Sequence, residues 1–144
     1  MKKIIAMMLT AVMAFALAGC GDSVDTEGPA FEEVNTIEGV SLELAEDTLK
    51  ASRGTFTLTN DTDKDLTYDP KEFHLETKED DGWQESVGTR LSEWKTEEME
   101  LIKSGESIDI EVNWKAIHGT IAKGDYRVTL MVEGEPVSCE FYKD

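Results

Sequence analysis

Apolar and polar side chains alternate along most of the chain from residue 39 onward. Alternation with period two is typical of strands that bury one face, because successive side chains point to opposite sides. The pattern predicts seven strands, whose apolar positions are Val40, Leu42 and Leu44; Phe56 and Leu58; Leu66 and Tyr68; Phe73 and Leu75; Ile108, Ile110, Val112 and Trp114; Tyr126, Val128, Leu130 and Val132; and Val137, Cys139 and Phe141. Residues 85–99 break the pattern, and within them residues 91–95 could form either a helical turn or a loop over one end of the fold.

Turn-forming sequences separate these strands. Residues 60–63 follow the second strand, residues 79–82 resemble the end of a hairpin, and residues 133–136 join the last two strands. Short strands with frequent turns predict an all-β fold, an antiparallel sandwich of about seven strands. Tyr126 follows a tight turn at the start of a late strand, which is the position of the tyrosine corner in Greek-key sandwiches.

The first 19 residues have a different character. An apolar run over residues 4–18, with Thr10 as its one polar residue, follows two lysines. The run is shorter than the roughly 20 residues that span a bilayer and fits a secretory signal. It ends in Leu17-Ala18-Gly19-Cys20, which resembles the lipobox of bacterial lipoproteins. We therefore expect cleavage before Cys20, lipidation of its thiol, and anchoring in the cell membrane on the extracytoplasmic face, since two or more acyl chains anchor stably.

The expected mature chain is strongly acidic. Residues 20–144 carry 12 basic side chains against 31 acidic ones, a net charge of −19. This charge argues against binding to nucleic acid and to anionic lipid headgroups, since both require clustered Lys and Arg. Residues 20–38 are polar with little periodicity, and we expect them to form a flexible tether of about 20–25 Å between the lipid and a domain over residues 39–144.

One acidic turn has the spacing of metal ligands. Asp61, Asp63 and Asp65 lie at positions i, i+2 and i+4, as do the first three ligands of an EF-hand loop. Leu66 stands where such a loop requires glycine. The turn is therefore either a weak surface calcium site or an ordinary polar turn, and we expect no other cofactor.

Catalytic motifs are not found in the sequence. No Gly-x-Ser-x-Gly, His-Glu-x-x-His or glycine-rich phosphate loop occurs. His74 has a predicted outward position, and His118 lies beside a turn glycine. After lipidation of Cys20, Cys139 has no cysteine partner in the chain, and its strand pattern predicts that it faces the core. We expect no enzyme activity.

The three tryptophans differ in their surroundings. Trp114 belongs to a strand pattern and is predicted to lie in the core. Trp83 follows a turn and is a candidate for the cap of a sheet edge or for a contact surface. Trp94 lies in a charged, irregular segment, and an aromatic residue in such a loop is a candidate contact residue. The alternative for Trp94 is that it covers one end of the core.

Several stretches of the sequence resemble a bacterial immunoglobulin-like domain family. They are residues 102–107, 112–114, 118–119 and 123–128, supported upstream by residues 56–60 and 82–83. The resemblance covers about residues 39–135 and implies an immunoglobulin-like sandwich, an extracytoplasmic setting and no catalytic residues. One departure is His118, where the family pattern has an aromatic residue before Gly119. The order of turns is also similar to the Bacillus intracellular proteinase inhibitor family.

The leading functional hypothesis is a non-catalytic surface module that binds an unidentified protein or envelope polymer. An extracellular proteinase inhibitor-like protein and a weak calcium-binding module are the alternatives.

Overall fold

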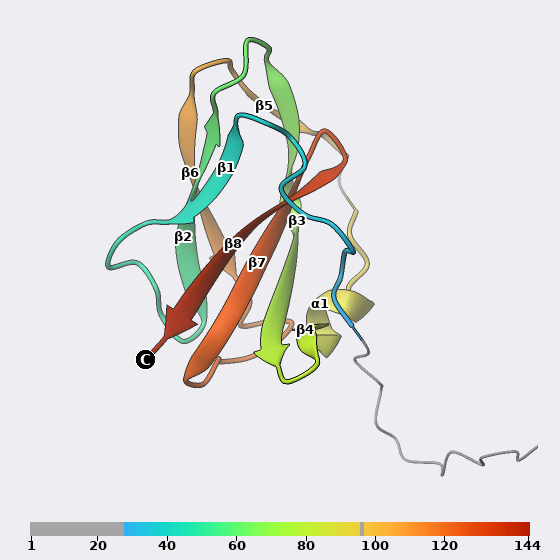
Figure 1. The fold of residues 1–144 in the computed structure, drawn as a ribbon, viewed down its shortest axis with the longest axis vertical. Coiled ribbons are helices and arrows are strands. Elements are labelled where there is room, and N and C mark those ends of the chain that lie inside the picture. The colour runs from blue at the N-terminus through green and yellow to red at the C-terminus, as the bar shows by residue number, and fades with distance from the viewer. Residues whose placement is uncertain (1–27, 96) are drawn as a thin grey trace, which may run out of the picture.

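The computed structural model describes residues 28–95 and 97–144 (Figure 1). The signal segment and Cys20 lie outside these residues and stay predictions. Eight strands and one short helix are described: β1 Val40–Leu44, β2 Arg53–Asn60, β3 Leu66–Glu79, β4 Gly82–Glu85, α1 Val87–Leu91, β5 Glu100–Ile102, β6 Ser107–Asn113, β7 Gly124–Val132 and β8 Glu135–Lys143. Within the described residues, no helix has the length and apolar character needed to cross a bilayer.

Two antiparallel sheets face each other. The first has the order β1-β2-β6, and the second has the order β4-β3-β7-β8, with β5 paired to β3. The chain changes sheet between β2 and β3, between β5 and β6, and between β6 and β7. This partition corresponds to the A-B-E and C′-C-F-G sheets of the immunoglobulin fold. The predicted all-β, immunoglobulin-like sandwich is therefore confirmed.

The core lies between the sheets and follows the predicted alternation. Phe56 and Leu58 from β2 are fully buried, as are Leu75 and Val128 from the opposite sheet. Trp114 is also fully buried, as predicted, and its Nε1 donates a hydrogen bond to the Ala51 carbonyl at 2.9 Å. Burying an indole in this way is favourable because its polar group keeps a partner.

A tyrosine corner fixes the start of β7. The Tyr126 hydroxyl donates a hydrogen bond to the carbonyl of Ala122 at 2.8 Å, four residues upstream. The Tyr126 ring packs against Phe141, with 5.9 Å between the ring centroids. The predicted role of Tyr126 is confirmed, and the corner ties the crossover from β6 to the core of the second sheet.

The strand boundaries differ from the prediction around Pro70. The third and fourth predicted strands form one long strand, β3, whose pairing with β7 is irregular between Tyr68 and Phe73. Five steps along β3, from Tyr68 to Phe73, oppose only two along β7, from Val132 to Leu130, and this bulge moves the core-facing side chains from even to odd positions. Pro70, which cannot donate to a strand ladder, lies within the bulge. Strands β4 and β5 are too short to show a period, and α1 comes before the helical turn considered at residues 91–95.

The N-terminal segment of the described chain is bound to the second sheet. We call residues 28–38 the strap; in Figure 1 it runs, in blue, from the region of α1 and β4 toward the turn between β7 and β8. The Gly28 amide donates to the Gln84 side chain at 2.8 Å, and the Asn35 amide donates to the Pro136 carbonyl at 2.9 Å. The prediction of a free tether is therefore wrong for residues 28–38, because these residues cover polar groups on the outer face of the sheet.

Candidate functional site

The acidic turn between β2 and β3 is organised by an asparagine. The Asn60 side chain donates to the carbonyls of Lys64 at 2.8 Å and Ile102 at 3.1 Å. The Asp65 carboxylate accepts the amide of Ser104 at 3.0 Å. Across residues 28–95 and 97–144, no three His, Cys, Asp or Glu side chains are placed to hold a metal ion. Asp61, Asp63 and Asp65 thus belong to a polar turn and do not form the considered calcium cluster.

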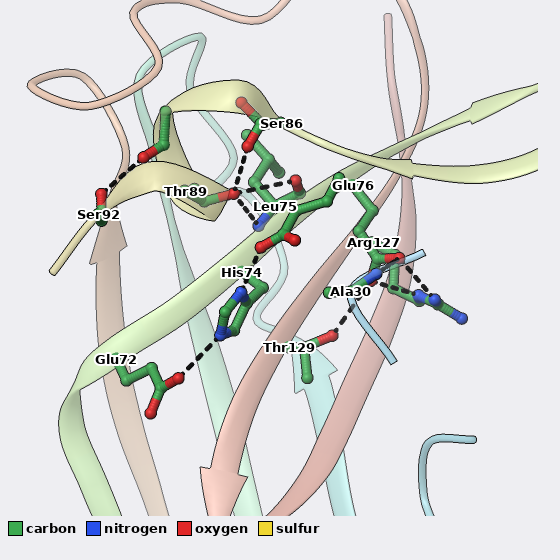
Figure 2. A network of polar contacts seen from close by, with 12 residues as sticks. Ala30, Glu72, His74, Leu75, Glu76, Ser86, Thr89, Ser92, Arg127 and Thr129 are labelled. Atoms are coloured by element: carbon green, nitrogen blue, oxygen red, sulfur yellow. Dashed lines mark hydrogen bonds and ion pairs between the residues drawn. The ribbon is translucent and has the colours of Figure 1, made fainter. Parts of the chain in front are cut away.

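A buried ion pair lies on the outer face of the second sheet (Figure 2). Glu76 of β3 and Arg127 of β7 stand opposite each other in the ladder. Arg127 Nε donates to Glu76 Oε1 at 2.9 Å, and Nη2 donates to Oε2 at 2.7 Å. The exposed fractions of the Arg127 and Glu76 side chains are only 9% and 0%. A bidentate contact of this kind is geometrically specific and offsets part of the cost of burying both charges.

The strap completes the surroundings of this ion pair. The Ala30 amide donates to Glu76 Oε2 at 3.2 Å, so the carboxylate has a hydrogen bond from the strap as well as from Arg127. Beside it, the hydroxyls of Thr129 and Ser138 are hydrogen-bonded at 2.6 Å, and the Ser138 amide donates to the Asn35 side chain at 2.7 Å. Polar groups of the strap are therefore hydrogen-bonded to polar groups on the face of the sheet that the strap covers.

Trp83 lies on the same outer face, in edge strand β4. The Arg127 guanidinium carbon is 4.7 Å from its ring centroid, and Lys78 Nζ is 5.7 Å from the centroid. Cations at such distances are attracted to the face of an indole ring. The structure thus places Trp83 at a sheet edge, one of its two predicted locations, where it is half-buried beside the ion pair.

Trp94 packs against the margin of β3. Its ring centroid lies 5.3 Å from that of Phe73 and 6.0 Å from that of His74. Its Nε1 is buried and has no hydrogen-bond partner among the described residues. These contacts favour the alternative in which Trp94 covers the sheet, although the residue is only half-buried.

His74 faces outward from the sheet but is covered. Its ring contacts the Phe31 ring of the strap edge to face, with 5.0 Å between centroids. Nδ1 is hydrogen-bonded to Glu85, and Nε2 lies 2.9 Å from Glu72 Oε1. Burial alone lowers the pKa of His74, but the hydrogen bonds and charges of Glu85 and Glu72 outweigh burial and hold the pKa above 6.5.

The second histidine joins α1 to the loop after β6. His118 Nδ1 is hydrogen-bonded to the Ser86 hydroxyl, and burial lowers the pKa of its imidazole. A Cβ added at Gly88 would lie 1.5 Å from the Ile117 carbonyl oxygen, so only glycine allows this close approach. The serine–histidine contact therefore has a clear structural role in holding α1 against the loop.

An open cleft runs along the seam where β1 and β8 meet. Its volume is about 660 Å³, and its lining combines apolar, acidic and polar groups: Val34, Asn35, Leu42, Glu43, Leu44, Arg127, Ser138, Cys139, Glu140 and Phe141. Cys139 is half-buried and contacts the core from this cleft, so it faces inward as predicted but not into the dry interior. Burial raises the pKa of the Cys139 thiol, which makes it a poor nucleophile at neutral pH.

Comparison with known proteins assigns the family. Residues 36–142 match the model of the bacterial Ig-like domain. The chain belongs to this family. No curated protein sequence matches this Ig-like domain.

Two solved structures resemble the Ig-like domain distantly. The archaellum periplasmic stator protein FlaG from Sulfolobus acidocaldarius is 10% identical, with a TM-score of 0.45 over 71% of this chain and 99% of that chain. The Pseudomonas fluorescens alkylpurine DNA glycosylase AlkC, bound to DNA containing an abasic site analog, is 16% identical, with a TM-score of 0.38. The alignment with AlkC covers 72% of this chain and 30% of that chain. Neither likeness is close enough to inform function.

Removing the buried cation should destabilise the Ig-like domain strongly. We expect Arg127→Met to lower the free energy of unfolding by about 3–5 kcal/mol, because it leaves the Glu76 carboxylate buried without its cation. The matched control is Arg53→Met, which removes a 4.0 Å contact with Glu111 between side chains that are 51% and 58% exposed. That change should cost at most about 1 kcal/mol. Urea denaturation measures both, and equal losses would contradict the assigned role of Arg127.

The two histidines should make the free energy of unfolding depend on pH in opposite directions. The raised pKa of His74 means that its contribution is fully present below pH 6.5 and is lost as pH rises through the folded-state value. The lowered pKa of His118 means that stability falls as pH drops below 6.5. Urea denaturation from pH 5 to 9 should show that His74→Gln removes the alkaline loss, whereas His118→Gln alters only the acidic side. An unchanged alkaline profile in His74→Gln would contradict this account.

Proposed function

We propose that this protein is a lipid-anchored, extracytoplasmic lipoprotein whose Ig-like domain is a non-catalytic binding module for an unidentified protein or polymer of the cell envelope. The observation that carries the proposal is the cleft of about 660 Å³ between β1 and β8. Apolar side chains, carboxylates and backbone edges are accessible together there, which is the combination that binding sites use for affinity and specificity. Membership of the bacterial Ig-like domain family supports a surface module without a catalytic role.

The chemistry of the two histidines also supports a binding module. His74 uses both ring nitrogens in hydrogen bonds to Glu85 and Glu72 beneath the strap. His118 uses Nδ1 in its contact with Ser86 at the junction of α1 and the neighbouring loop. Both imidazoles therefore have structural partners, whereas a general base needs access to the proton that it removes.

The bound strap changes the expected distance from the membrane. Eight residue steps separate Cys20 from Gly28, the first residue described. A chain of that length reaches at most about 29 Å when fully extended. If Cys20 carries the lipid, the Gly28 end of the domain stays within this distance of the bilayer, and a partner must be accessible there.

The lipid anchor is tested by removing its thiol. We expect Cys20→Ala to move the protein from the membrane fraction to the soluble fraction of the cell envelope, because the acyl chains provide the attachment. The matched control is Cys139→Ala, which removes the other cysteine and should leave the protein in the membrane fraction. Immunoblots of fractionated cells measure the distribution, and retention of the Cys20→Ala protein in membranes would contradict the anchor.

The binding role is tested by photocrosslinking on intact cells. A benzophenone amino acid in place of Glu43 lies in the cleft, whereas the same group in place of the exposed residue Glu111 lies on β6, at the far side of the same sheet and outside the cleft lining. We expect a discrete crosslinked species from position 43 and none from position 111, with partners identified by mass spectrometry. Crosslinking from position 111 alone, or from neither position, would contradict the cleft as the binding site.

A further inference from the structure

Strand β8 is an edge strand whose backbone is only partly covered. It pairs with β7 on one side and is the last strand in the order of the second sheet. The Pro136 carbonyl and the Ser138 amide point to the open side, because both are bonded to Asn35 of the strap. Backbone groups of alternate residues point the same way in an antiparallel ladder. The amides and carbonyls of Glu140 and Tyr142 therefore also point to the open side.

The strap already pairs with the first part of this edge. The Asn35 amide donates to the Pro136 carbonyl at 2.9 Å, and the Asn35 side-chain oxygen accepts the Ser138 amide at 2.7 Å, so Asn35 binds two backbone groups that an added strand would bind. Asn35 has a left-handed backbone with φ of 59°, which breaks an extended course. Among the described residues, no backbone group outside β7 is hydrogen-bonded to Glu140 or Tyr142, and the Glu140 carbonyl has only a long contact of 3.6 Å from the Cys139 thiol of the same strand. The second half of the β8 edge is therefore free to pair with another chain.

The cleft beside this edge has the chemistry of a strand-binding groove. Across the seam, β1 contributes Leu42 and Leu44, which join Phe141 of β8 in the apolar lining. Glu43 and Glu140 add carboxylates to the lining. Side chains of an extended segment alternate in direction, so one set would pack in the apolar seam and the other would lie near the carboxylates. Such a segment would alternate apolar and basic residues.

The negative charge around the cleft favours a cationic partner protein over a second copy of this chain. Arg127 also lines the cleft, but its charge is paired with Glu76. Two copies that paired antiparallel at the free part of the edge, Glu140 and Tyr142, would bring their Glu140 side chains close together, and like charges on adjacent strands are destabilising. The net charge of −17 of the full chain adds to this repulsion. The edge therefore favours a cationic partner.

We propose that the cleft binds an extended, basic segment of a partner protein, which adds a strand to β8 at Glu140 and Tyr142. The proposal rests on the proposed binding function and names the partner chemistry of the same cleft. Backbone hydrogen bonds provide affinity in this recognition mode, and pockets for alternate side chains provide specificity. The hydrogen bonds of Asn35 fix where the added strand begins.

The test uses the protein purified from cells in detergent micelles and a short, end-blocked peptide that alternates valine and lysine. We expect the peptide to slow amide hydrogen exchange at Glu140 and Tyr142 by at least about tenfold, as measured by NMR. A valine–glutamate peptide should fail because of charge repulsion. A valine–lysine peptide with N-methylated backbone positions should fail because it lacks the donors that strand addition needs.

A charge-matched pair of variants locates the site. Glu140→Lys should weaken binding of the valine–lysine peptide by about tenfold, as for reversal of a close charge contact. Glu111→Lys changes the net charge equally on the other sheet and should leave binding within about twofold. Circular dichroism verifies that both variants fold.

Three results would overturn strand addition at β8: no added protection at Glu140 and Tyr142, equal binding of the N-methylated peptide, or equal effects of the two variants. Protection without peptide in a protein that sediments as a dimer would assign the edge to a second copy instead. If peptide binding fails while position 43 still crosslinks a partner in cells, only the strand-addition proposal falls. If both experiments fail, the proposed binding function falls with it.

Discussion

The buried pair of Glu76 and Arg127 is the constraint on which the outer face of the second sheet depends. A carboxylate with no exposed surface is costly to bury, and a single partner does not satisfy all of its hydrogen-bonding positions. Arg127 provides two hydrogen bonds, and the strap provides a third through Ala30. The strap is thus bound because the sheet presents polar groups that require cover, and the same Arg127 guanidinium stacks on Trp83.

The position of the strap determines which surface is available. It covers His74 with Phe31 on one side and bonds the start of the β8 edge through Asn35 on the other. It adds Val34 to the lining of the cleft at the β1–β8 seam. Because the strap bonds β8 only at Pro136 and Ser138, the rest of the β8 edge and the acidic cleft beside it stay open. A second consequence is that only eight residue steps separate Gly28, at the start of the strap, from the predicted lipid at Cys20.

The sequence predicted the parts of the fold that depend on local alternation. Trp114 and Tyr126 have the predicted roles because one lies at the end of an alternating strand and the other follows a turn glycine. Pro70 concealed the continuity of β3, because the interruption of the alternation looked like a strand boundary. Regular patterns thus identified the core, and their breaks were the main source of error.

The candidate site was harder to predict because its contacts join distant polar residues. Glu76 and Arg127 occupy ordinary solvent-facing positions in their strand patterns, and only the pairing of β3 with β7 brings them together. The strap has no periodicity, so nothing local indicated that it would bind a sheet. The aspartate spacing was misleading because spacing does not fix side-chain direction; Asn60 organises that turn from within β2.

Amide hydrogen exchange directly measures whether the second sheet holds the strap in place around the Glu76–Arg127 pair. The amides of Gly28, Ala30 and Asn35 are hydrogen-bonded to Gln84, Glu76 and Pro136, whereas Glu32 and Glu33 are exposed neighbours in the same segment. If the strap is bound, the three bonded amides exchange slowly and the two glutamate amides exchange fast in the native protein. Uniformly fast exchange, at the rate of an unstructured chain across all five positions, would contradict binding of the strap.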